Sequence, residues 1–239
     1  MHTVTVRTAN GDRAVSIHDG AEADARSIFG LEEYNIRKIW FQKVATIIDV
    51  GAHIGLFTIL MKMTFPQATV HCFEPLPINI SLLRKNLSGD GNIHINEYGL
   101  SSYRHSAEIW LSPAFGHGAA STHKTRDHSD VSQPANFRVA AEELQAIDGD
   151  ISILKIDTEG HELRILRNIA PHFDRIETIF LEVHSGLALE NILSLLRQKF
   201  IAVHFAGGMG NRYKVLFASK SAIALEKIRA DIAPEIYYD

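Results

Sequence analysis

The feature that most constrains the fold is an alternation of short apolar runs with longer helical patterns, which begins at Ala45. Short apolar strands separated by helices of about ten residues or more predict crossover units, hence a mainly parallel α/β sheet with helices on both faces. The predicted strands are 45–51, 69–75, 92–100, 151–158 and 178–184, and the predicted helices are 54–65, 77–89, 139–147, 161–173 and 187–200.

Both ends of the chain depart from this alternation. Near the C-terminus, the predicted strands 201–208 and 213–219 are joined by a turn too short for a crossover, so they must be antiparallel. We therefore expect one reversed strand near the edge of the sheet. At the N-terminus, alternating residues flank Asn10-Gly11, which predicts a hairpin over 1–19, followed by a helix over 21–29. We predict an extension, 1–44, at the substrate or dimer surface, and one domain, 45–239.

Composition excludes some classes of function. The chain has 239 residues, 46% of them hydrophobic, and can bury a sizeable core. Its net charge of -4 argues against a nucleic-acid partner, and its single cysteine, Cys72, excludes an internal disulfide. The first residues lack the apolar core of a signal peptide, and the longest apolar stretch is broken by Lys62. We expect a cytoplasmic protein without membrane contact, which could form a homodimer.

The stretch 112–136 has few large apolar residues and many Gly, Ser, His and Asp. One interpretation is a surface loop. The other is an active-site loop, because long loops in compact domains are often functional. Both interpretations remain open on the residues alone.

The segment DVGAHIG, Asp49 to Gly55, lies between the first strand and its helix. Gly51 permits a tight turn, and the N–H groups at the helix start could bind a carboxylate or phosphate, although a turn that only needs glycine is an alternative. Asp49 suits an ammonium group better than a phosphate. Glu74 ends the second strand 25 residues after Asp49, where doubly wound folds place an acid for ribose hydroxyls. An ammonium and a ribose together favour S-adenosylmethionine over a dinucleotide.

Three motifs carry a resemblance to a known family. The segments IIDVGAHIGLFT, FEPLPINISLLRKNL and LKIDTEGHELRIL resemble, in order and spacing, those of FkbM-type methyltransferases. The resemblance runs from about Thr46 to His184 and is looser at Glu33-Tyr34 and in the closing strands. It implies a class I methyltransferase fold: a Rossmann-like seven-stranded sheet whose last strand is antiparallel.

The resemblance also implies which residues bind the cofactor. The methionine end of S-adenosylmethionine would lie at the glycine loop, the ribose at Glu74 and the adenine near Glu97 to Leu100. His53 and Thr158 stand where the family usually has Asn and Val. The implied cofactor-binding residues are Asp49, Gly51, Ala52, His53, Gly55, Glu74, Pro75, Tyr98, Gly99, Leu100 and Asp157.

Candidates for chemistry follow two strands, at the edge where open α/β sheets bind ligands. Asp157 and Glu159 end one strand, while Glu182 and His184 end the next, so the four can surround one pocket. We favour an acid/base group of Asp157, Glu159 and His184, with a histidine that titrates near neutrality as the proton acceptor. Glu182 is a candidate for substrate binding.

Alternatives to this acid/base group remain. Carboxylates with a histidine also suit a divalent metal, but no ligand spacing compels one, so we expect none. We attribute Glu162 entirely to the helix dipole, and leave His161 undecided between packing, capping and catalysis.

The acceptor is constrained only by class. No Asn/Asp-Pro-Pro-Tyr motif is present, which disfavours methylation of base or glutamine amines. The resemblance implies O-methylation of a hydroxyl on a sugar or a secondary metabolite such as a polyketide. N-methylation of an amino group, or cofactor binding without catalysis, are the alternatives. Ser121, Thr122 and His123, in the long loop, are candidates for substrate contact.

Overall fold

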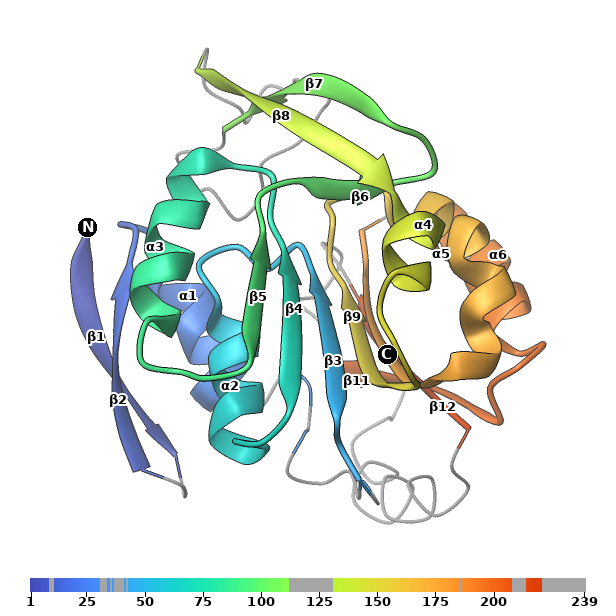
Figure 1. Ribbon diagram of the computed structural model, residues 1–239, viewed down its shortest axis with the longest axis horizontal. Coiled ribbons are helices and arrows are strands. Elements are labelled where there is room, and N and C mark those ends of the chain that lie inside the picture. The colour runs from blue at the N-terminus through green and yellow to red at the C-terminus, as the bar shows by residue number, and fades with distance from the viewer. Residues whose placement is uncertain are drawn as a thin grey trace, which may run out of the picture.

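A computed structural model describes residues 1–8, 11–30, 34, 36, 41, 43–111, 131–184, 186–207 and 214–220. Its centre is a seven-stranded sheet in the order β11-β12-β10-β9-β3-β4-β5 (Figure 1). The strands are β3 (Thr46–Val50), β4 (Thr69–Phe73), β5 (Ile93–Asn96), β9 (Ile151–Ile156), β10 (Ile176–Val183), β11 (Ala202–Gly207) and β12 (Lys214–Ser219). β12 pairs antiparallel with both β10 and β11, and the other pairs are parallel. The predicted sheet and its reversed last strand are confirmed.

Helices cover both faces of this sheet, as predicted (Figure 1). One face packs against α2 (Leu56–Thr64) and α3 (Pro77–Leu87). The other packs against α4 (Ala140–Gln145), α5 (Glu162–Ile169) and α6 (Gly186–Leu196). A 3₁₀ segment, Ala170–Arg175, continues α5. Strand residues buried on both sides explain why the sequence shows continuous apolar runs.

The N-terminal extension contains the predicted hairpin and a helical segment. β1 (His2–Thr8) pairs antiparallel with β2 (Gly11–Ile17), and α1 (Glu22–Ala25) continues into a π-helical turn, Arg26–Gly30. Apolar residues of the extension join the same hydrophobic cluster as α2 and α3. The extension therefore packs on the face of the sheet that carries these helices, and its boundary at residue 44 stays a prediction.

The predicted third strand, 92–100, is wrong as a single element. β5 ends at Asn96, and β6 (Gly99–Ser101) belongs to a separate sheet with β7 (His105–Trp110) and β8 (Ser132–Val139), in the order β6-β8-β7. A Cβ atom at Gly99 would lie 2.6 Å from the ring of Phe137 on β8. Glycine there lets the chain leave the central sheet and pair with β8.

β8 also shortens the predicted loop 112–136, because residues 132–136 form a strand. The sequence did not indicate this strand, because proline and the polar residues beside Pro134 have low β propensity. Residues 112–130, with Ser121, Thr122 and His123, lie outside the described residues.

Two simpler expectations concern burial and membranes. Cys72 is fully buried, and burial raises the pKa of its thiol. Among the described residues, no helix has the length and apolarity that crossing a membrane requires.

Candidate active site at the carboxyl edge of the sheet

The glycine loop after β3 runs close against the end of β9. Gly51 has a φ of +76°, and a Cβ atom there would lie 1.8 Å from the carbonyl oxygen of Asp157. Only glycine fits this position. The backbone N–H groups of Gly51 and Ala52 both donate to the carbonyl oxygen of Phe73. The loop is thus held from both sides before any ligand binds.

Gly55, at the start of α2, also occupies a position that favours glycine. Its φ is +91°, and a Cβ atom there would lie 2.8 Å from Leu83 of α3. The first turn of α2 can therefore start tight against α3. That the N–H groups of this turn bind a ligand stays a prediction.

Asp49, at the end of β3, is fully buried. Its Oδ2 accepts a hydrogen bond of 2.7 Å from the Thr58 hydroxyl, and its Oδ1 lies 3.3 Å from Nζ of Lys155. Asp49 thus has partners within the protein, and its predicted contact with an ammonium group stays a prediction.

Lys155 is a site residue that the sequence reasoning missed. It is 4% exposed, donates a 2.7 Å hydrogen bond to the carbonyl oxygen of Gly51, and lies 3.3 Å from Oδ2 of Asp157. Burial alone would lower the pKa of Lys155, but the carboxylates of Asp157, Asp49 and Glu182 outweigh it and raise that pKa. Lys155 stands opposite Asp49 in the β3–β9 register, a pairing between two strands that no local sequence pattern reports.

Glu74 follows β4 and is 4% exposed. Its Oε2 accepts from the backbone N–H of His53 at 2.8 Å, and its Oε1 from the N–H of Leu76 and the amide of Asn79 at 3.0 and 3.1 Å. Burial raises its pKa, against these donors. A carboxylate has about four acceptor positions, so these three bonds leave room for one more hydroxyl donor. Glu74 therefore fits a ribose.

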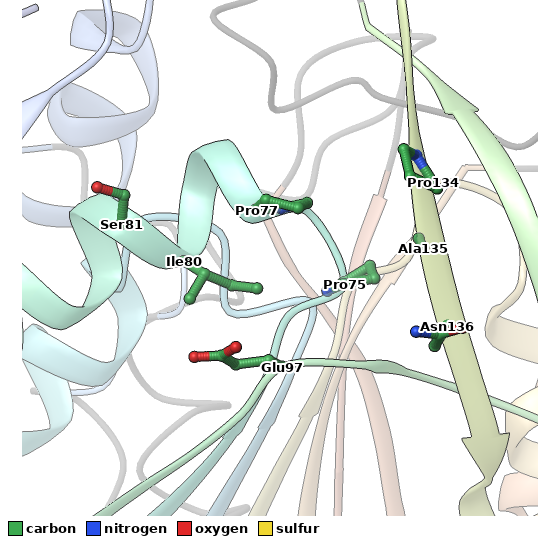
Figure 2. Close-up of a pocket in the computed structure, with 8 residues that line it drawn as sticks. All are labelled: Pro75, Pro77, Ile80, Ser81, Glu97, Pro134, Ala135 and Asn136. Carbon is green, nitrogen blue, oxygen red and sulfur yellow. The ribbon is translucent and has the colours of Figure 1, made fainter.

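A pocket of about 330 Å³ opens beside Pro75, the residue after Glu74, between α3 and β8 (Figure 2). Its lining residues are Pro75, Pro77, Ile80, Ser81, Glu97, Pro134, Ala135 and Asn136. Pro75 belongs to the predicted cofactor-binding set, and Glu97 to the segment expected near adenine. Tyr98, Gly99 and Leu100 follow directly, but none of the three lines this pocket.

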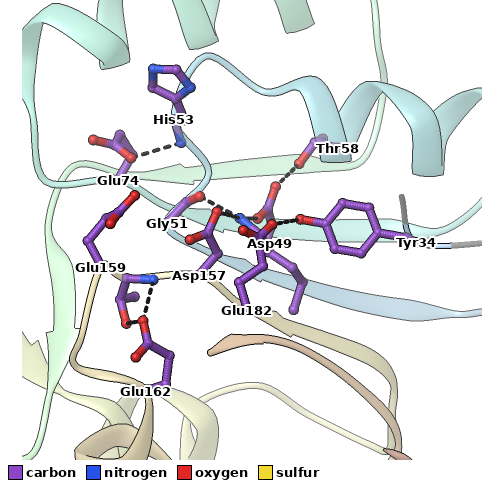
Figure 3. Close-up of polar contacts among 12 residues, drawn as sticks. Tyr34, Asp49, Gly51, His53, Thr58, Glu74, Asp157, Glu159, Glu162 and Glu182 are labelled. Atoms are coloured by element: carbon purple, nitrogen blue, oxygen red, sulfur yellow. Dashed lines mark hydrogen bonds and ion pairs between the residues drawn. The ribbon is translucent and has the colours of Figure 1, made fainter. Parts of the chain in front are cut away.

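The predicted acid/base residues do converge, and Figure 3 shows two of them, Asp157 and Glu159, beside the glycine loop. Nε2 of His184 lies 3.9 Å from Oδ1 of Asp157 and 3.5 Å from Oε2 of Glu159. β9 and β10 are parallel neighbours, as the prediction required. The cluster lies next to the glycine loop, since Asp157 is also the residue against which Gly51 packs.

Glu162 makes side-chain contacts besides its position at the start of helix α5. Its Oε1 accepts from the backbone N–H of Gly160 at 2.8 Å and lies 3.1 Å from Nδ1 of His184. The helix dipole alone is therefore an incomplete explanation, because Glu162 also sets the orientation of the imidazole ring. His161 occupies the N-cap position of α5, but its side chain makes no capping hydrogen bond.

The surroundings of His184 change its expected role. Burial opposes its charge, but the hydrogen bond that its Nδ1–H donates to Glu162 and the charges of Asp157 and Glu159 raise its pKa to about 10. The expectation that His184 titrates near neutrality is wrong, because three acids surround it. Burial, together with the charges of Asp157 and Glu162, instead raises the pKa of Glu159 to about 7, although the charge of His184 opposes this shift. Glu159 is therefore the group of this cluster that titrates near neutrality.

Three of these residues could also hold a metal ion. Asp157, Glu182 and His184 each offer one ligand atom, and these atoms lie within 4.8 Å of one another. Glu182 is 7% exposed and accepts a hydrogen bond from the hydroxyl of Tyr34. Two carboxylates and an imidazole suit Mg²⁺ or Mn²⁺ as a partial ligand set. The expectation of a metal-free site stays a prediction.

Comparison with known proteins identifies a family and relatives with similar sequences. The Methyltransferase FkbM domain model matches residues 49–200. The 31-O-demethyl-FK506 methyltransferase FkbM of Streptomyces tacrolimicus is 26% identical over 226 residues, which cover 81% of this chain and 86% of that protein. The hexuronic acid methyltransferase AglP of Haloferax volcanii is 27% identical, covering 63% of this chain and 60% of that protein.

Another relative and a solved structure complete the comparison. Methyltransferase 1 of Beauveria bassiana is 26% identical, and the match spans 57% of this chain and 64% of that protein. The chain therefore matches less than two thirds of two of these relatives. The crystal structure of precorrin-6y C5,15-methyltransferase from Geobacter metallireducens has a TM-score of 0.50 at 15% identity, over 80% of this chain and 89% of that one, and shows the shared class I fold. With a family match over more than half its length, this chain belongs to the FkbM methyltransferase family.

Proposed function

We propose that the protein is an S-adenosylmethionine-dependent methyltransferase that O-methylates a hydroxyl on a sugar or secondary metabolite. One observation carries this proposal: the glycine loop and the acid/base cluster meet at Asp157. Gly51 packs on the backbone of Asp157, and Lys155 contacts the side chains of both Asp49 and Asp157. A methyl donor at the loop would thus lie beside groups that can take a proton from an acceptor.

The cofactor-binding roles follow the geometry from one end of the loop to the other. Asp49 and the loop around Gly51 would hold the methionine end, and Glu74 would accept a hydrogen bond from a ribose hydroxyl. The pocket lined by Pro75 and Glu97 would receive the adenine. When bound, S-adenosylmethionine supplies an activated methyl group, so the protein must supply orientation and proton transfer.

The acid/base roles are redistributed relative to the sequence analysis. As the acceptor oxygen takes the methyl group, the hydroxyl proton passes to Glu159, whose pKa of about 7 suits a general base. His184 remains protonated and pairs with Asp157 and Glu159. Asp157 and Glu182 would orient the acceptor.

The substrate class rests on the relatives. One relative is named for 31-O-demethyl-FK506, which is a polyketide. Another is named for a hexuronic acid, which is a sugar acid. Both are small molecules with hydroxyl groups. The net charge of -4 is our reason for proposing no nucleic-acid partner.

Methyl transfer from tritium-labelled cofactor tests the proposal directly. The panel contains hydroxyl acceptors (methyl glycosides of glucuronic and galacturonic acid, and 31-O-demethyl-FK506) and glucosamine, which carries an amino group besides its hydroxyls, and NMR of each labelled product identifies the methylated atom. We expect the methyl group on a hydroxyl oxygen and none on the amino nitrogen. Methylation of nitrogen alone would replace O-methylation by N-methylation, and cofactor binding without any transfer would leave a binding protein.

A further inference from the structure

The N-terminal extension reaches the acid/base cluster through Tyr34. This side chain is 1% exposed, and its hydroxyl donates a hydrogen bond to Oε1 of Glu182 (Figure 3). The two residues are 148 positions apart in the sequence. A side chain of the extension thus contacts an acid that the sequence analysis placed at the substrate.

The ring of Tyr34 is fixed by two aromatic neighbours. Phe57 of α2 packs edge-on at 5.0 Å between ring centroids, and Phe180 of β10 does so at 5.7 Å. α2 follows the glycine loop, and β10 carries Glu182 two residues beyond Phe180. Edge-to-face packing on two sides restricts the ring, so the direction of the hydroxyl is set before a ligand arrives.

Glu182 lies next to the proposed acid/base residues Asp157 and His184. It offers a carboxylate oxygen within 4.8 Å of ligand atoms of both Asp157 and His184, and its charge helps to keep Lys155 protonated. Burying a carboxylate this deeply costs desolvation free energy, which a well-packed apolar residue at the same place would avoid. A purely structural role therefore does not explain why an acid stands here.

We propose that Tyr34 is a positioning residue for methyl transfer, holding the carboxylate of Glu182 so that it orients the acceptor hydroxyl group. This inference rests on the proposed function. With Oε1 held by Tyr34, the rotation of the carboxylate is fixed, and with it the direction in which Glu182 accepts a further hydrogen bond. The extension would thus contribute to the acceptor site through Tyr34 and Glu182.

The test compares Tyr34→Phe, which keeps the ring and removes the hydroxyl, with Thr178→Val. Thr178 is a buried β10 residue whose hydroxyl lies 3.5 Å from Ser219 Oγ, so it controls for the loss of a buried hydroxyl away from the cluster. We expect Tyr34→Phe to lower kcat/KM for the acceptor roughly 10- to 100-fold, as for a lost hydrogen bond to a charged group. The affinity for S-adenosylhomocysteine, measured by calorimetry, should not change in either variant.

A double-mutant cycle shows whether Tyr34 acts through Glu182. In a Glu182→Gln background, Tyr34→Phe should have little further effect on kcat or KM, because the carboxylate that it orients is gone. The proposal would be overturned if the double variant lost the product of the two single-variant losses in kcat/KM. It would also be overturned if Tyr34→Phe alone kept the wild-type kcat/KM.

Crystal structures of the wild type and of Tyr34→Phe, both with S-adenosylhomocysteine, give a readout that needs no acceptor. We expect the Glu182 carboxylate to rotate in the variant while Phe57 and Phe180 stay in place. An unmoved carboxylate would refute the positioning role even if turnover fell. If the wild type methylates nothing in the panel, the proposed function fails, and the crystal structures still decide the role of Tyr34.

Discussion

The two ends of the candidate site are held by opposite arrangements of charge. At the cofactor end, the carboxylate of Glu74 is surrounded by N–H donors from His53, Leu76 and Asn79. At the acceptor end, the imidazole of His184 is surrounded by carboxylates. The first end is a negative group among neutral donors, and the second is one positive group among several acids.

This difference separates binding from chemistry. The donors around Glu74 are largely backbone groups whose positions follow from the fold, so that end should keep its geometry over a wide pH range. The acids around His184 repel one another, and their geometry depends on which of them carry protons. We therefore expect substitutions at the acceptor end to change rate and pH dependence, and those at the cofactor end to change affinity.

The largest effect should come from Glu159→Gln. We expect kcat to fall roughly 100- to 10,000-fold, the usual contribution of a general base. In the wild type, kcat/KM should rise through pH 7 as Glu159, with its pKa of about 7, loses its proton. It should fall towards pH 10, where His184 loses its own. The rise near pH 7 should disappear in the variant.

The exposed acid Glu190, on α6, supplies the control for that experiment. Glu190→Gln should keep both the rate and the pH profile. If Glu159→Gln retained the rise near pH 7, Glu159 would not be the base, and His184 or Asp157 would have to be reconsidered.

Lys155→Met tests the residue that joins the two ends. Removing its charge leaves Asp49 and Asp157 without their shared cation, so the free energy of unfolding should fall by about 3–5 kcal/mol in urea denaturation. Lys62→Met is the matched control, because Lys62 is also buried but donates only to the carbonyl oxygens of Pro66 and Ala68. The free energy of unfolding of Lys62→Met should fall by less, about 1–3 kcal/mol. Equal losses would mean that the ion pairs of Lys155 contribute little.

Two substitutions, Glu74→Gln and Asp157→Asn, distinguish cofactor binding from catalysis most directly. Glu74→Gln should weaken S-adenosylhomocysteine binding about 10- to 100-fold, because a carboxylate oxygen that accepts charged hydrogen bonds is lost. Asp157→Asn should lower kcat by a larger factor than it lowers this affinity. Calorimetry and single-turnover kinetics on both variants provide the comparison. If both variants lost affinity and rate in the same ratio, the division between binding and chemistry would be abandoned.

The local geometry at the proposed cofactor end could be predicted from the sequence more easily than the charge states at the proposed acceptor end, for a physical reason. The turn at Gly51 and the acid at Glu74 depend on local backbone geometry, which leaves a signature within a few residues. The pKa values of Glu159 and His184 depend on Glu162 and Asp157 brought together by two strands, and no local pattern reports them. Lys155 was missed for the same reason, since its partner Asp49 lies on another strand.

The fold shows the same limit. The seven-stranded sheet could be predicted because most of its strands are rich in apolar residues and are separated by helical patterns. The small sheet β6-β8-β7 could not be predicted in this way. β8 contains Pro134 and alternating polar residues, and β6 is only three residues long. Its register depends on Gly99 fitting against Phe137, a contact between residues 38 positions apart.

The smallest effect on the rate of methyl transfer should come from removing or adding a divalent metal ion. EDTA treatment, or added Mg²⁺ or Mn²⁺, should leave the rate of methyl transfer unchanged. Asp157 already has Lys155 Nζ at 3.3 Å, and His184 Nε2 lies 3.5 Å from Glu159. A cation at Asp157, Glu182 and His184 would need the proton of Nε2 displaced and would lie close to the ammonium of Lys155, which a divalent charge opposes. Activity lost in EDTA and restored by Mg²⁺ would overturn the acid/base assignment. His184 would then act as a metal ligand, and the acceptor end would be held by a bound cation instead of a protonated imidazole.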